Sequence, residues 1–238
     1  LCGHLGRYKK IVKKTYIISS ELLYVFAILL LGFGVNLMSI ADCGMSMIVC
    51  PAYIISQKYN HLTYGQAEYL VAGFLFVIFC TVLRKFRLAY LSSFITGFLY
   101  ATTADILKFI LPIFQVTISS LVIRMICFFL GMMISALAVA MFYETYFYPQ
   151  IYDFFCKVLS KKYKISLKLF KTCFDCTFLM ISLFMSLILF NDFVGIGLGT
   201  IIMAICNGAL IQFFRTKVLS HFIYIPRFKK LSYYLNNA

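Results

Sequence analysis

The stretch IISSELLYVFAILLLGFGVNLMSIA, from Ile17 to Ala41, carries a single charged residue, Glu21. A helix needs about 20 apolar residues to cross a hydrocarbon core about 30 Å thick, so this stretch predicts a transmembrane helix. Basic residues precede it, but its apolar part is too long for a secretory signal, and we expect it to be retained. Five further windows of this kind follow: Tyr64 to Leu83, Leu88 to Leu111, Ile118 to Ala140, Cys173 to Phe190 and Phe193 to Phe214.

The composition of the whole chain excludes an ordinary soluble protein. Of the 238 residues, 63% are hydrophobic and 13% are charged, whereas soluble domains average roughly half apolar and about a quarter charged. The 22 Lys and Arg residues outnumber the 8 Asp and Glu residues, which gives a net charge of +14. The sequence therefore predicts an all-α polytopic membrane protein with six transmembrane helices.

The basic residues predict the orientation, because short loops rich in Lys and Arg stay on the cytoplasmic side. All of them except Lys58, Lys108 and Arg124 precede the first window, follow the sixth, or lie between windows two and three or four and five. We therefore expect both termini to be cytoplasmic. The segment from Lys157 to Lys171 alternates apolar and basic residues, which predicts that it lies on the inner leaflet against membrane lipid. Since orientation explains the charge, we expect no nucleic acid partner.

The chain also contains an internal repeat. GFGVNLMSIA (residues 32–41) aligns with GMMISALAVA (residues 131–140), and the same offset of 99 places Lys58 on Lys157. Further on, GFLYATTAD (residues 97–105) aligns with GTIIMAICN (residues 199–207). Generic similarity between apolar stretches is the alternative explanation.

Two short apolar segments fall at equivalent places in this repeat. Met45 to Tyr59 contains Pro51, and Tyr143 to Leu159 contains Pro149. Each is too short to cross the membrane, so we expect re-entrant or interfacial elements. With three crossings in each repeat, the second copy enters from the opposite side, which predicts two inverted three-helix repeats. The expected division is a basic tail (1–15), a first repeat (16–114), a second repeat (115–216) and a basic tail (217–238).

The residues in two of these windows resemble the YczE/YitT group of bacterial membrane proteins, in particular its YczE-like members. The resemblance rests on Gly32, Gly34, Leu37, Ala41 and Gly44, and on the glycine-rich stretch from Gly195 to Phe214 with its pair Gly199 and Thr200. It covers nearly the whole chain. Two departures stand out: Met45, Ser46 and Met47 replace an expected turn, and Glu144, Thr145 and Pro149 stand where a glycine is usual. The resemblance implies a multi-pass protein of the bacterial inner membrane and supports the architecture more than an activity.

Polar residues within the predicted helices are the first candidates for a binding site, because a charge in hydrocarbon needs a partner or a wet cavity. Asp105 lies three residues before Lys108. One interpretation is a local ion pair, extended by Arg124, that ties the third and fourth windows together. In the other, Asp105 faces its repeat mate Asn207 and binds a cation or a polar substrate.

A second set of candidates flanks the short segments. Asp42 and Glu144 each follow a predicted helix and precede a Pro-containing segment. In one interpretation they are flanking carboxylates that favour the next helix through its dipole. In the other, Asp42 with Ser46 and Glu144 with Thr145 line the mouths of the two re-entrant elements and contribute to a binding site.

Three small polar residues, Asn36, Ser39 and Ser135, lie at repeat-related places in apolar helices. Hydrogen bonding between helices is the default interpretation, since small polar groups in membranes usually serve packing. A contribution to the substrate site is the alternative.

No pattern predicts a cofactor, a metal site or an enzyme. Cys173 and Cys176 have Cys-x-x-Cys spacing, but the sequence shows neither a second pair nor an activating environment. The three histidines are scattered, and no nucleophilic triad, phosphate loop or zinc-protease helix is present.

Inverted repeats with paired short apolar segments are typical of alternating-access transporters, whose site lies at the repeat interface. The leading hypothesis is therefore a small secondary transporter or permease for a small organic solute. Its rivals are a substrate-capture subunit of an ATP-driven vitamin importer and a non-transport regulatory or assembly protein. The expected partners are membrane lipid and an unidentified solute, and a homo-oligomer is compatible with the sequence.

Overall fold

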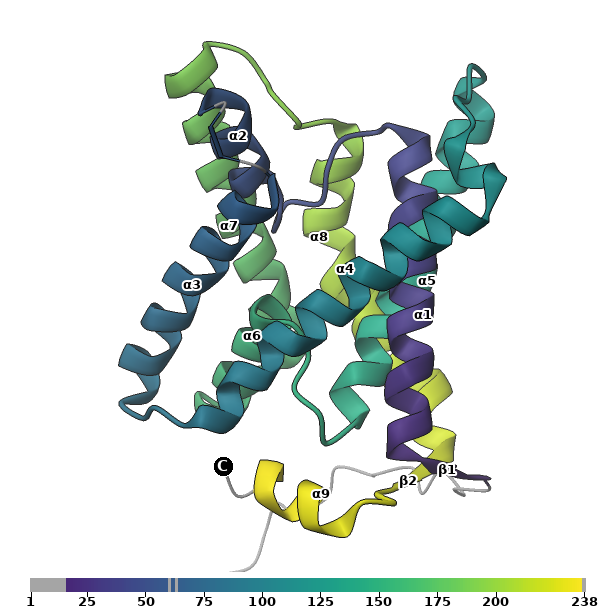
Figure 1. Ribbon diagram of the computed structural model, residues 1–238, viewed down its shortest axis with the longest axis vertical. Coiled ribbons are helices and arrows are strands. Elements are labelled where there is room, and N and C mark those ends of the chain that lie inside the picture. The colour runs from purple at the N-terminus through teal and green to yellow at the C-terminus, as the bar shows by residue number, and fades with distance from the viewer. Residues whose placement is uncertain (1–15, 60, 63, 237–238) are drawn as a thin grey trace, which may run out of the picture.

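The computed structural model describes residues 16–59, 61–62 and 64–236 (Figure 1). The basic tail predicted over residues 1–15 lies outside the described residues. The chain is almost entirely helical, with two short strands near its ends. The helices are α1 (Ser20–Ala41), α2 (Cys50–Lys58), α3 (Tyr64–Leu83), α4 (Ser92–Ile110), α5 (Leu121–Glu144), α6 (Ile151–Lys162), α7 (Leu167–Phe190), α8 (Leu198–Phe213) and α9 (Lys229–Asn236), and the strands are β1 (Tyr16–Ser19) and β2 (Phe222–Ile225).

Five of the helical segments are long and apolar enough to cross a membrane. They are Ser20–Ala41, Gly65–Leu83, Leu121–Glu144, Leu167–Phe190 and Leu198–His221, and they establish a multi-pass helical membrane protein. The window predicted from Leu88 to Leu111 forms a 3₁₀ turn (Leu88–Leu91) followed by α4, which has 19 residues. α4 is not among the five, because its second half carries threonines, Asp105 and Lys108.

Helices α1 and α5 pack side by side in opposite directions along one side of the bundle (Figure 1). Arg124, near the start of α5, bonds to the Ala41 carbonyl at the end of α1, and Tyr146, just after α5, bonds to Ser20 at the start of α1. α4 packs on the other side of α1, and α8 packs against α5. The chain thus places two long helices from its first half and two from its second half in one contiguous core.

Glycine permits the close crossing of α1 and α5. A Cβ at Gly131 would lie 2.7 Å from the Gly34 carbonyl oxygen, and a Cβ at Gly34 would lie 2.9 Å from the Gly131 carbonyl oxygen. Both distances are well below van der Waals contact, so only glycine allows this approach. Small residues serve the same purpose in many membrane helix pairs.

The two short helices each pack on long helices of both halves. α2 packs on α3 and also on α7, while α6 packs on α7 and also on α3. Pro51 lies in the first turn of α2, where its missing N–H leaves no helical hydrogen bond unmade. Both predicted short segments therefore contain a helix, which begins at Cys50 and at Ile151.

Two hydrogen bonds from threonines join the halves in a reciprocal way. Thr96 Oγ1 on α4 donates to the carbonyl of Tyr148, in the loop before α6, at 2.7 Å. Thr200 Oγ1 on α8 donates to the carbonyl of Met45, in the loop before α2, at 2.6 Å. Both threonines are almost completely buried.

Two lysines repeat this reciprocal arrangement at the ends of the short helices. Lys58 Nζ, at the end of α2, donates to the Leu189 carbonyl near the end of α7 at 2.8 Å. Lys162 Nζ, at the end of α6, donates to the Val82 carbonyl near the end of α3 at 2.6 Å. Each lysine satisfies a helix C-terminal carbonyl that has no partner within its own helix.

Several predicted helix boundaries are wrong, including both ends of the fourth window, which forms α5 from Leu121 to Glu144 instead of Ile118 to Ala140. The first helix begins at Ser20 instead of Ile17, because Ser19 caps it and residues 16–19 form β1. The last begins at Leu198 instead of Phe193, since the preceding loop contains Gly195 with φ +74°. The fifth begins at Leu167 instead of Cys173, so Lys171 belongs to a helix and not to a basic cytoplasmic loop.

The two ends of the described chain meet at one end of the bundle. β1 pairs in parallel with β2, and α9 lies across the same end (Figure 1). Glu21 Oε1 fixes this arrangement by accepting hydrogen bonds from the backbone N–H groups of Arg227 (2.8 Å) and Phe228 (2.9 Å) and from the Tyr146 hydroxyl (2.8 Å). Residues 222–236, here called the C-terminal segment, therefore cover the end of the bundle where α1 begins.

Candidate functional site

Asn36 and Ser135 lie in the packed centre of the bundle. Asn36 Nδ2 on α1 donates to the Ala104 carbonyl of α4 at 2.7 Å, so this amide joins two helices, as the packing interpretation expects. Ser135 is buried beside Gly34, and its hydroxyl has no hydrogen-bond partner in the part of the chain that the structure describes. Ser39 is exposed on α1.

Asp42 closes the end of α1 in a left-handed conformation (φ 47°) and pairs with Arg124. Arg124 Nη2 lies 3.2 Å from Asp42 Oδ2 and also donates to the Asp42 carbonyl, and Nε donates to the Ala41 carbonyl at 2.7 Å. Ser46 is half-buried in the following loop, and its carbonyl accepts the N–H groups that begin α2. The Asp42 carboxylate itself is exposed, so the guanidinium chiefly satisfies the end of α1.

Glu144 and Thr145, at the other end of α5, lie together in a polar pocket. Glu144 Oε1 pairs with Arg215 Nε at 2.8 Å, and Thr145 Oγ1 donates to the Phe142 carbonyl at 2.9 Å. The pocket has a volume of about 240 Å³ and lies between the start of α1, the end of α5 and the C-terminal segment. Its lining residues are Ser20, Glu144, Thr145, Tyr146, Tyr224, Pro226 and Ser232.

Lys157 on α6 contacts the same end of α5. Its Nζ donates to the Thr145 carbonyl at 3.1 Å and to the Phe142 carbonyl at 3.5 Å. Burial disfavours the charged amine and lowers the pKa of Lys157 to about 8, although the nearby Glu144 acts in the opposite direction. The end of α5 thus brings a carboxylate, a guanidinium and an amine of reduced basicity together.

The structure does not join Asp105 to either predicted partner. Asp105 is exposed on α4 and forms no ion pair with Lys108 among the described residues. Arg124 pairs with Asp42 instead. Asn207 on α8 donates its amide to Asp175 Oδ2 on α7 at 3.4 Å, not to Asp105.

A buried ionic cluster, which the sequence did not predict, joins α6 and α7. Lys171 Nζ lies 3.0 Å from Asp153 Oδ1 and 3.0 Å from Asp175 Oδ1. The three side chains are 1%, 5% and 0% exposed, respectively. Tyr143 on α5 donates its hydroxyl to Asp153 at 3.1 Å, and Asn207 completes the cluster from α8. Four helices of the second half therefore converge on two carboxylates and one ammonium.

The signal for this cluster was present in the sequence. Lys171 and Asp175 are four residues apart and share a helix face. Because the fifth window was started at Cys173, Lys171 was assigned to a basic loop at the inner leaflet, and this assignment is wrong. Asp153, in a short segment distant in sequence, could not be paired with them without the fold.

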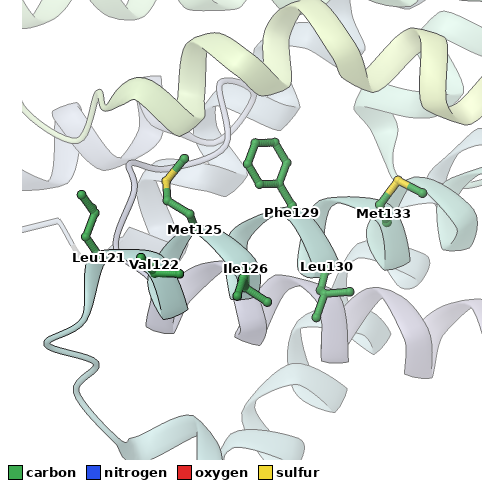
Figure 2. A pocket seen from close by; sticks show the side chains of 7 residues that line it. All are labelled: Leu121, Val122, Met125, Ile126, Phe129, Leu130 and Met133. Carbon is green, nitrogen blue, oxygen red and sulfur yellow. The ribbon is translucent and has the colours of Figure 1, made fainter.

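An apolar groove lies on α5 away from these polar residues. Figure 2 shows its seven lining side chains, Leu121, Val122, Met125, Ile126, Phe129, Leu130 and Met133, along one stretch of the helix. Its volume is about 540 Å³. With no polar lining side chain, the groove offers a solute no hydrogen bond that would orient it. Among residues 16–59, 61–62 and 64–236, no three His, Cys, Asp or Glu side chains are grouped to hold a metal ion.

Two comparisons with known proteins found a match. The sequence model described as "Family of unknown function (DUF6198)" matches residues 18–216. The uncharacterized protein YyaS of Bacillus subtilis (strain 168) is 25% identical over 200 residues, which cover 84% of this chain and 94% of YyaS. No solved structure matches. Neither match bears the YczE/YitT name, so that narrower resemblance stays a prediction.

Proposed function

This chain belongs to the DUF6198 family, and we propose that it is a small secondary transporter or permease for a small organic solute, built from two inverted repeats. The observation that carries the proposal is the reciprocal exchange of contacts between its halves. Each half has the same order of elements, namely a long helix, a short helix and two long helices.

The exchanged contacts support a two-fold relation between the halves. Thr96 and Thr200 each bond to the loop before the short helix of the other half, and Lys58 and Lys162 each bond to the end of a long helix of the other half. Reciprocal contacts of this kind are expected when two similar units face each other across a two-fold axis. They favour a register in which Lys58 corresponds to Lys162 instead of Lys157.

The position of the chain ends supports α4 as a sixth crossing. β1 precedes α1, β2 follows α8, and the two strands pair, so the chain enters and leaves the bundle at the same end. An even number of crossings is needed for this, whereas the five apolar helices alone give an odd number. With α4 included, each half crosses three times and the second half is inverted, which is the architecture of many alternating-access transporters.

The same end carries the basic residues Lys217, Arg227, Lys229 and Lys230. By the positive-inside rule we assign it to the cytoplasm of a bacterial inner membrane, with both termini inside. The polar pocket at Glu144 and Thr145 then opens toward the cytoplasm, at the inner end of the α1–α5 interface between the repeats. Its carboxylate and hydroxyl groups suit a small polar solute that both donates and accepts hydrogen bonds.

A ligand screen followed by a flux assay tests this function. The purified full chain is heated in detergent with a panel of metabolites, and a solute present at about 100 times its dissociation constant should add about 2.7 kcal/mol of stability. Any solute that stabilises the protein is then loaded into proteoliposomes for exchange measurements. Thr145→Val should weaken both the thermal stabilisation by the solute and its exchange. Asn191→Ala, which alters the C-terminal cap of α7 outside the pocket, should leave both unchanged.

Three outcomes would overturn the proposal. A panel with no stabilising solute would favour a regulatory or assembly protein. Co-purification with an ATPase module, together with solute binding but no flux, would favour a substrate-capture subunit. Flux that is insensitive to Thr145→Val would remove the pocket from the solute path.

A further inference from the structure

We propose that the cluster of Asp153, Lys171 and Asp175 is a proton-binding site in which Asp175 holds one exchangeable proton. As a coupling site this inference rests on the proposed transport function, but proton binding itself can be tested without any solute.

The charge of the cluster is not balanced by its own residues. Two carboxylates and one ammonium leave one uncompensated negative charge, and all three side chains are at least 95% buried. An isolated buried charge is costly, and such a group becomes neutral when a proton can reach it. Binding one proton leaves one ammonium and one carboxylate, which is a neutral pair.

Within residues 16–59, 61–62 and 64–236, no second cation forms an ion pair with either carboxylate of the cluster. Tyr143 from α5 donates its hydroxyl to Asp153 and is therefore neutral, and Asn207 from α8 carries no charge. Cys156 from α6 is fully buried, and burial raises the pKa of its thiol well above the ordinary value, so it too is neutral. Two further titratable neighbours, Cys176 on α7 and Tyr100 on α4, which interacts electrostatically with Asp153, carry no positive charge in either protonation state.

The two carboxyl groups differ in how well their negative charge is stabilised. Asp153 lies in the first turn of α6, where the helix dipole favours a carboxylate, and its Oδ1 receives the Tyr143 hydroxyl. Asp175 lies within α7, away from any helix N-terminus, and is 0% exposed. Its Oδ1 has no partner other than Lys171 Nζ at 3.0 Å in the described structure, an ammonium that it shares with Asp153, and its Oδ2 accepts only the long bond from Asn207. The proton therefore belongs on Asp175, where it converts a poorly satisfied acceptor into a donor.

The step itself is simple proton transfer. A proton from water forms an O–H bond with an Asp175 carboxylate oxygen, and no electron is gained or lost. Lys171 then pairs with Asp153 alone, so protonation turns an ammonium shared between a carboxylate of its own helix α7 and a carboxylate of α6 into one that pairs only with α6. A site that alters the α6–α7 contact in this way is suited to coupling proton movement to rearrangement of the second repeat.

Infrared spectroscopy of the purified full chain in lipid nanodiscs tests the site directly. The wild-type protein should show the C=O stretching band of a protonated carboxyl group that shifts in D₂O and disappears reversibly as the pH is raised. Asp175→Asn should remove this band. Asp153→Asn should also remove it at neutral pH, because the remaining Lys171–Asp175 pair is already balanced.

Further variants assign the proton and check the charge argument. Asn207→Ala should shift the band, because Asn207 contacts Asp175, while Tyr143→Phe should leave its frequency unchanged. Lys171→Met removes the ammonium and should double the intensity of the carboxyl band, since both Asp153 and Asp175 then become protonated. Asp192→Asn, which alters an exposed acid in the loop after α7, is the matched control and should change nothing.

A wild-type protein without a titrating carboxyl band, or a band that survives Asp175→Asn, would overturn the proposal. If Lys171→Met does not fold, the wild-type titration and the Asn207→Ala shift decide the question alone. These measurements are separate from the solute experiments. A titrating carboxyl band without any solute flux would support the proton site and refute the transport function. Solute flux without such a band would support the transport function and refute the proton site.

Discussion

The crossing of α1 and α5 predicts that Gly131→Ala destabilises the protein, whereas Gly73→Ala stabilises it. A Cβ at Gly131 would lie 2.7 Å from the Gly34 carbonyl oxygen and 2.7 Å from Met38 Cγ. The Met38 side chain can move aside, but the Gly34 oxygen is backbone, so the two helices must separate. A Cβ at Gly73 in α3 would meet no atom within 4 Å.

The magnitudes follow from two opposing terms. Replacing glycine with alanine inside a helix gains about 0.5–1 kcal/mol, and this term is common to both variants. Overpacking a tight contact costs about 1–3 kcal/mol, and this cost applies only to Gly131→Ala. We expect Gly73→Ala to raise the free energy of unfolding by up to about 1 kcal/mol and Gly131→Ala to lower it by about 0.5–2 kcal/mol.

Thermal unfolding of both variants in one detergent, followed by circular dichroism, measures this difference. The chain contains no Trp, so intrinsic tryptophan fluorescence cannot be used. The wild-type protein and Gly97→Ala, whose added Cβ would also meet no atom within 4 Å, serve as references. A Gly131→Ala midpoint equal to or above that of Gly73→Ala would refute the close helix contact.

Three further predictions concern other contacts. The pKa of Lys157 is lowered from 10.5 to about 8 in the folded protein. Between these two pH values the unfolded chain therefore binds more protons than the folded chain, and the free energy of unfolding should rise with pH. Lys157→Met should remove that rise, as measured by unfolding at a series of pH values. Glu21→Ala removes the acceptor for two backbone N–H groups of the C-terminal segment, so trypsin should cleave at Arg227 faster than in wild type, whereas Asp192→Ala at the other end of the bundle should not change the rate. Thr200→Val leaves a buried carbonyl without its donor and should cost about 1–3 kcal/mol, and Thr96→Val, which removes the reciprocal bond, should cost a similar amount; unfolding midpoints of both variants check this.

Hydropathy predicted the helical membrane fold and five of its long apolar helices, because such helices depend mainly on local sequence. The helix ends were less predictable. Residues 16–19 are apolar enough to continue α1, yet they pair with β2 from the far end of the chain, and no local pattern signals that pairing. α4 illustrates the same limit, since its polar second half makes hydropathy alone ambiguous.

The binding role of the candidate residues stays a prediction, and the structure shows only where they lie. Glu144 and Thr145 do line a pocket, because both follow directly from where α5 ends. Lys171 was assigned to the membrane surface, since a lysine is normally solvated and its burial depends on two acids, one of them in α6. The partners of a buried charge are set by tertiary packing, which a single sequence does not reveal when they lie on different helices.

The parallel pairing of β1 with β2 has a consequence for biosynthesis. β1 is among the first described residues to leave the ribosome, and β2 is synthesised about 200 residues later. The partners of β1 and of the Glu21 carboxylate, which are β2 and the backbone N–H groups of Arg227 and Phe228, are therefore available only after α8 has been synthesised. A chain that terminates before β2 would lack these contacts, so the junction forms only in chains that extend past Phe228.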